Sequence, residues 1–109
     1  MTTKVQQWAE QFDGEMTEAR IREIFDAKTH KVSRNVYPAY AKFPGTMIAG
    51  KCFVMDGACI YIVKGERVTI KAGEFADLPQ GGYEFEVSGD QAVSLVKVFP
   101  LPMQLRRNS

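Results

Sequence analysis

The chain has 109 residues, of which 45% are hydrophobic and 25% are charged, with a formal net charge of +1. This size and balance predict one globular domain that can bury a core without needing a disulfide or a metal. Lysine and arginine are interspersed with aspartate and glutamate, which argues against a nucleic-acid-binding protein, because such a protein would concentrate basic residues on one face.

Residues 1–31 are predicted to form a helical segment ahead of a β-domain at residues 32–109. The apolar positions of a first helix recur every three or four residues, and they are Val5, Trp8, Ala9 and Phe12. Thr17 is a suitable N-cap for a second helix, whose apolar stripe consists of Ile21, Ile24 and Phe25. We expect these helices to pack on the outside or an open end of a barrel, or against a partner subunit.

From about Val32 the apolar residues alternate with polar ones, which is the pattern of β-strands. Pro38 and Pro44 favour edge strands or bent strands at the start of this region. Three dipeptides predict hairpin turns between the later strands: Asp56-Gly57, Gly65-Glu66 and Gly89-Asp90. About seven or eight short strands with regular turns predict a β-sandwich or a β-barrel.

Two of these strands differ in their patterns. Arg67–Ala72 alternates cleanly and should have one wet face and one buried face. Cys59–Val63 is apolar at every position, so both of its faces must be covered. We expect that cover to come from the N-terminal helices or from a second subunit.

The two cysteines, Cys52 and Cys59, lie in apolar strand segments and are interpreted as buried, reduced thiols. The N-terminus lacks the apolar core of a signal peptide, and no apolar segment approaches the ~20 residues of a membrane helix. These features predict a cytoplasmic protein that binds neither a membrane nor nucleic acid.

Two glycine-containing segments resemble the two motifs of the cupin family. Gly73, Pro79 and Gly81 match the second motif, which has the form G-x5-P-x-G-x2-H-x3-N. Gly57, which follows Phe53-Val54-Met55-Asp56, matches the end of the first motif, G-x5-H-x-H-x(3,4)-E-x6-G. The resemblance covers about residues 32–99. It implies a mostly β fold, a small cupin-type β-barrel (a jelly-roll sandwich) with one or two short N-terminal helices, and a homodimer.

In most cupins the histidines and the glutamate of these motifs hold a metal, but this chain has other residues there. Counting back from Gly57 places the glutamate on Gly50, and the two histidines on Pro44 and Thr46 or on Phe43 and Gly45. The single histidine, His30, precedes the barrel. The resemblance therefore implies a cupin without the metal centre, and we expect no metal and no cofactor.

The histidine position of the second motif has two candidates. Strict counting places it on Glu84, whereas strand alternation puts Tyr83 and Phe85 on the buried face and Glu84 with Glu86 on the other. Burying two carboxylates in a dry barrel would cost several kcal/mol, which favours Tyr83. Glu84 would face inward only if the barrel held a wet, cationic pocket.

Three functions remain open on the sequence. The first is a binding protein that holds a small, partly apolar molecule inside the barrel. The second is a metal-independent isomerase, epimerase or lyase with Tyr83 or Glu84 as acid or base and Lys42 stabilising a negative charge. The third is a structural or docking barrel that acts through its dimer interface. The candidate ligand-binding residues are Tyr40, Lys42, Cys52, Val54, Tyr83 and Phe85.

Overall fold

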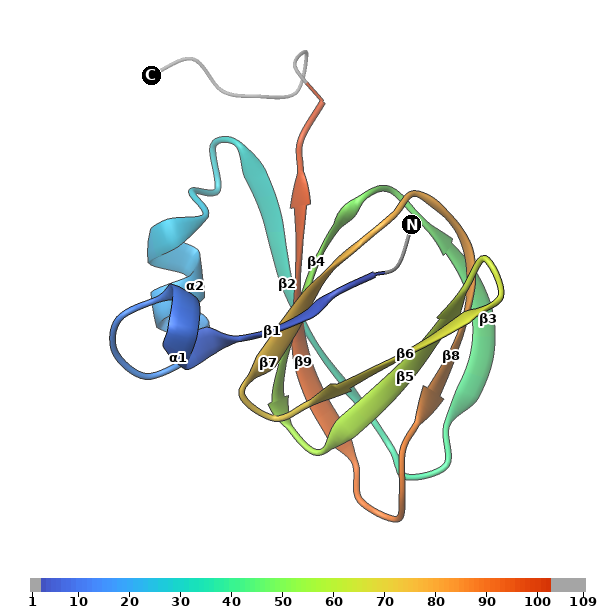
Figure 1. Cartoon of the computed structure of the whole chain (residues 1–109). Coiled ribbons are helices and arrows are strands. Elements are labelled where there is room, and N and C mark those ends of the chain that lie inside the picture. Colours follow the sequence, from blue (N-terminus) through green and yellow to red (C-terminus); the bar gives the residue numbers. More distant parts are fainter. Residues whose placement is uncertain (1–2, 103–109) are drawn as a thin grey trace.

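The computed structural model describes residues 3–102, which form two antiparallel β-sheets and two short helices (Figure 1). The helices are α1 (Trp8–Gln11) and α2 (Glu18–Ile24). The strands are β1 (Val5–Gln7), β2 (His30–Tyr37), β3 (Lys42–Met47), β4 (Gly50–Asp56), β5 (Ala58–Val63), β6 (Glu66–Lys71), β7 (Glu74–Leu78), β8 (Gly81–Val87) and β9 (Val93–Pro100). No helix within the described residues is long and apolar enough to cross a membrane.

The sheets pack face to face as a small β-sandwich. The five-stranded sheet has the order β1-β7-β4-β9-β2, and the four-stranded sheet has the order β3-β8-β5-β6. The first long strands, β2 and β3, therefore lie at sheet edges, as the prolines beside and within them predict. The mostly β class and the two short N-terminal helices are confirmed.

The predicted first helix is wrong at its start. Val5 lies in β1, where it pairs with Ala76 of β7, and only the single turn of α1 is helical. Trp8 adds a further hydrogen bond next to the β1–β7 pairing, from its backbone N–H to the Gly73 carbonyl at 3.0 Å. The open edge of β7 offers the N-terminal backbone several sheet hydrogen bonds, whereas one more helical turn would gain little on its own.

The predicted second helix is confirmed, including its cap. The Thr17 hydroxyl accepts a hydrogen bond from the Arg20 backbone N–H at 3.1 Å. Ile21 is fully buried and belongs to a second core with Trp8, Phe53, Phe75, Val96 and Val98. This second core lies on the outer face of the five-stranded sheet, so the helices cover the outside of the barrel (Figure 1).

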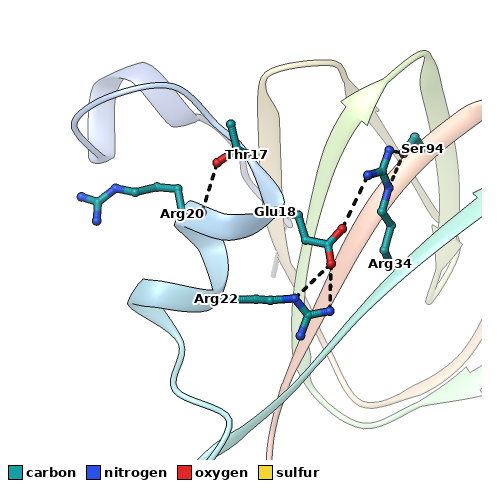
Figure 2. Close-up of polar contacts among 6 residues, drawn as sticks. All are labelled: Thr17, Glu18, Arg20, Arg22, Arg34 and Ser94. Carbon is teal, nitrogen blue, oxygen red and sulfur yellow. Dashed lines mark hydrogen bonds and ion pairs between the residues drawn. The ribbon is translucent and has the colours of Figure 1, made fainter.

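A polar network also holds α2 against this sheet (Figure 2). Glu18 accepts a hydrogen bond from Arg22 Nε at 3.0 Å and pairs with Arg34 of β2 at 3.5 Å. Arg34 in turn donates to the Ser94 hydroxyl of β9 from Nε and Nη2, at 3.2 and 3.1 Å. One arginine therefore links the start of the helix to two neighbouring strands.

Two of the three predicted hairpins are wrong. Strands β4 and β5 flank Asp56-Gly57, and β8 and β9 flank Gly89-Asp90, but each pair is divided between the two sheets. These dipeptides are corners at which the chain crosses from one sheet to the other. At Gly57, φ is +75° and a Cβ would lie 2.6 Å from the Ala92 carbonyl oxygen, so the first corner needs glycine. The hairpin at Gly65-Glu66 is confirmed, because β5 pairs with β6.

The all-apolar strand β5 is not covered by the helices, which lie on the other sheet. Its residues Cys59, Tyr61 and Val63 face the core between the sheets. Ile60 and Ile62 face the opposite side and remain partly exposed. The alternative cover, a second subunit, stays a prediction.

Candidate functional site

The positions that hold the metal in the cupin motifs come together at one end of this barrel. Phe43 and Gly45 lie on the side of β3 that faces the core. The two histidine positions of the first motif are therefore Phe43 and Gly45, as the longer motif spacing gives. Gly45 pairs directly with Tyr83 of β8. Tyr83 packs against the core, whereas the neighbouring Glu84 is exposed. Of the two candidates for the second-motif position, Tyr83 is therefore the inward residue.

Aromatic rings fill the space that ligand side chains would need. A Cβ on Gly45 would lie 2.7 Å from the Tyr83 hydroxyl oxygen and 2.8 Å from its ring. A Cβ on Gly50, the glutamate position, would overlap the ring of Phe99 and lie 2.6 Å from the Val98 carbonyl oxygen. Both glycines are thus sites of close approach, at which a side chain would displace an aromatic residue.

These residues do not fit a divalent metal. Phe43, Gly45 and Gly50 offer no side-chain ligand, and a single tyrosine does not make a metal site. Within residues 3–102, no group of three or more histidine, cysteine, aspartate or glutamate side chains is arranged to hold a metal ion. Lys97, which lines the same end of the barrel as Gly50 and Tyr83, would also repel a cation.

A cavity of about 230 Å³ lies at this end of the barrel. Its lining combines apolar side chains with hydroxyl, thiol and amine groups, and consists of Thr46, Met47, Ile48, Gly50, Lys51, Cys52, Tyr61, Leu78, Tyr83, Lys97 and Phe99. Ile48 is 50% exposed in the loop between β3 and β4, which places it at the mouth. A small apolar cavity with a few polar groups is the usual form of a ligand site.

Lys97 brings a positive charge into this cavity. It follows Val93 and Leu95 on the face of β9 that packs in the barrel core, and it pairs across the sheet with Cys52. Its ammonium donates to the Tyr37 hydroxyl at 3.2 Å and lies 5.5 Å from the centre of the Tyr37 ring. These contacts stabilise a charge that would otherwise be costly to place in a half-buried position.

Two thiols and a phenol lie beside the lysine. The Tyr61 hydroxyl donates to Cys52 Sγ at 3.6 Å, and both cysteines are buried and free. A hydrogen bond from Cys59 lowers the pKa of Cys52 against the opposing effect of burial, and Tyr61 and the charge of Lys97 lower it further. The same hydrogen bond raises the pKa of Cys59, together with burial. Burial, and then Cys52, raise the pKa of Tyr61.

Only two of the six predicted ligand-binding residues line the cavity. Cys52 and Tyr83 line the cavity, while Val54 and Phe85 are buried in the core next to it. Tyr40 and Lys42 lie outside: Tyr40 is 75% exposed in the turn after β2, and Lys42 pairs with Glu86 on the outer face of β3. These two candidates therefore do not line the cavity, because Tyr40 belongs to the turn rather than the strand and Lys42 lies on the outward face of β3.

Sequence reasoning missed Lys97 and Tyr61. Both belong to strands that are apolar on both faces, so alternation alone does not show which side is inward. The single charged residue inside the apolar run Val93–Phe99 is the signal that could have identified Lys97.

Comparison with solved structures identifies the fold. The EutQ protein of Clostridium difficile has a TM-score of 0.59 and 19% identity, over 92% of this chain and 66% of that chain. A putative ethanolamine utilization protein Q of Salmonella typhimurium has a TM-score of 0.56 and 23% identity, over 67% and 58%. The Cupin_2 domain of an XRE family transcriptional regulator from Enterobacter cloacae has a TM-score of 0.60 and 11% identity, over 94% and 99%. The chain has the cupin fold.

Because the sequence identities are between 11% and 23%, the similarity to these solved structures shows the fold and nothing about function. The matches to the Clostridium difficile and Salmonella typhimurium proteins span 66% and 58% of those chains, so this chain is shorter than either. No family model and no curated protein matches the sequence. The function must therefore be argued from the residues of the cupin barrel.

Proposed function

We propose that this cupin-fold chain binds a small, partly apolar molecule inside its barrel, without a metal. The observation that carries the proposal is the cavity of about 230 Å³ with Lys97, Tyr61 and Tyr83 among its lining residues. A barrel end that served only stability would be expected to be filled by apolar side chains. Its volume is below the usual range for drug-sized ligands, so the ligand is a small one.

A fragment screen by ligand-observed NMR tests this proposal. Ile48→Trp places a large ring at the mouth of the cavity, and its matched control is Val36→Trp on β2, where the native valine is 63% exposed. We expect a set of fragments that bind the native chain and Val36→Trp but not Ile48→Trp. Fragments that bind all three proteins alike, or none at all, would contradict a binding site in the barrel.

An acid–base reaction is the second candidate, favoured by the fact that Tyr83 and Lys97 line the same cavity. Glu84 is not part of this candidate, because it is exposed on the outer face. Tyr83→Phe separates the two functions. A reaction that uses the phenol loses turnover in this variant while the ligand still binds, whereas a pure binding protein shows no turnover to lose.

We also propose a cytoplasmic homodimer. Cys52 and Cys59 are neighbouring buried cysteines that remain free thiols, as is usual in the reducing environment of the cytoplasm. The dimer follows from the cupin resemblance, and the outer face of β5, with its partly exposed Ile60 and Ile62, is the surface that we assign to it.

A further inference from the structure

The cavity carries an excess of positive charge. Among its eleven lining residues, all within the described part of the chain, there are two lysines and no carboxylate. Lys51 is paired with Asp77, which is largely exposed to solvent. Lys97 makes no ion pair with any residue in the range 3–102. A half-buried ammonium without a counter-ion favours an anionic ligand.

The hydrogen-bond donors are sufficient for the two oxygens of a carboxylate. An ammonium has three N–H donors, and Tyr37 uses one of those of Lys97, which leaves two for a ligand among the contacts of residues 3–102. Tyr83 lines the same cavity with a hydroxyl group, as does Thr46 at its rim. A carboxylate accepts hydrogen bonds at both oxygens and gains most when the donor is charged.

Most of the remaining lining is apolar. Met47, Ile48, Leu78 and Phe99 offer a hydrophobic surface and no hydrogen-bond partner for a second charged group. A ligand with charge at one end and a short hydrocarbon chain or ring at the other satisfies both parts of the cavity.

We propose that the ligand is a small organic carboxylate with an apolar tail, and that Lys97 binds its carboxylate. The inference rests on the proposed binding function and specifies its ligand class. In electrostatic terms, the lysine supplies the positive charge that a metal supplies in the metal-holding cupins, at the same end of the barrel as Gly45, Gly50 and Tyr83.

Protein-observed NMR titrations with two matched probes test the ligand class. Butyrate and butyramide have nearly the same size and shape, but only butyrate is charged at neutral pH. We expect butyrate to bind at least tenfold more tightly than butyramide, with shifts concentrated at the cavity residues. Inorganic phosphate serves as a third probe, which has charge but no apolar tail, and it should bind more weakly than butyrate.

Two variants test whether the ammonium of Lys97 is the group that binds the carboxylate. Lys97→Met keeps most of the apolar stem and removes the ammonium, and we expect it to lose about tenfold in butyrate affinity with butyramide unchanged. Lys42→Met is the matched control on the outer face and should stay within about twofold of the native chain. If Lys97→Met does not fold, the comparison of butyrate with butyramide on the native chain still decides the ligand class.

Three results would overturn the proposal. They are equal affinities for butyrate and butyramide, an unchanged butyrate affinity in Lys97→Met, and stronger binding of phosphate than of butyrate. If butyramide binds as tightly as butyrate and Ile48→Trp abolishes both, the barrel is a binding site for neutral molecules and only the carboxylate class is wrong. If no fragment responds to Ile48→Trp, the binding function itself is wrong.

Discussion

At the scale of single residues, the cavity combines a thiol with a positive charge. Cys52 lines the cavity and pairs across the sheet with Lys97, whereas Cys59 lies in the barrel core and is not among the lining residues. Thiol reactivity depends on access and on the fraction of thiolate, which a nearby cation raises. The two cysteines should therefore differ in reactivity although both are buried.

We expect iodoacetamide to alkylate Cys52 faster than Cys59 in the folded protein. Peptide mass spectrometry after limited alkylation measures the two rates. The Lys97→Met variant should slow the reaction at Cys52, because it removes the neighbouring charge. Equal rates at the two cysteines, or faster labelling of Cys59, would contradict this assignment.

The buried phenol of Tyr61 should make the folded protein less stable at alkaline pH. Its pKa is raised above the ordinary value of 10.0, first by burial and then by Cys52. Above about pH 10 the unfolded chain releases this proton while the folded chain keeps it, so the contribution is full below pH 10 and declines as pH rises. The decline approaches about 1.4 kcal/mol per pH unit for one group.

Urea unfolding at about pH 8 and about pH 11 measures the effect, with Tyr61→Phe as the control. Since phenylalanine has no proton to release, the variant should lose less stability between the two pH values than the native chain. The same pH dependence in both proteins would show that Tyr61 does not contribute.

At the scale of secondary-structure elements, the short helix α2 is part of the barrel's outer core rather than an appendage. Ile21 packs with Phe53, Phe75 and two valines of β9. The helix has seven residues, which is too short to be stable alone in water. Its stability therefore comes from this contact, with the Arg34 network adding a partly exposed polar contribution.

Ile21→Ala should lower the free energy of unfolding by about 2–4 kcal/mol, since it removes a fully buried side chain and leaves a cavity. Thr17→Ala should cost about 1 kcal/mol, because it removes only the cap. Chemical denaturation of both variants measures the two values. A smaller effect for Ile21→Ala than for Thr17→Ala would mean that α2 does not share the core of the sheet.

The sequence predicts the turns of this fold better than its strand pairings. Asp56-Gly57 marks a real reversal of the chain, but the same residue types serve a hairpin and a corner between sheets. The pairing is decided by distant strands, since β4 finds its partners in β7 and β9. The inward position of Tyr83 was predictable because burying Glu84 is costly, whereas the inward position of Lys97 breaks the rule that charges face out.

At the scale of the whole molecule, the proposed dimer depends on the outer face of the four-stranded sheet. Ile62 pairs across the sheet with Glu84, so charged groups surround the small apolar surface of β5. The ion pairs of Glu86 with Lys42 and Arg67 lie on the same sheet. A dimer interface here would combine a small apolar centre with a charged rim.

We expect light scattering to give the mass of a dimer at micromolar concentration, and Ile62→Lys to give that of a monomer. The new lysine would lie on the partly exposed outer face between Glu84 of β8 and Arg67 of β6. The attraction to Glu84 offsets the repulsion from Arg67, so the variant should remain folded. Val36→Lys on β2 is the control and should stay dimeric. A native chain that is monomeric at high micromolar concentration would contradict the homodimer.

The packing of Phe99 against Gly50 limits how a metal site could be engineered into this barrel. A single substitution that introduces glutamate at position 50 would collide with the Phe99 ring and with the backbone of β9. Glutamate at position 50 would become tolerable only if a smaller residue replaced Phe99 and β9 shifted. A metal ligand at this position therefore requires several coordinated changes rather than one substitution.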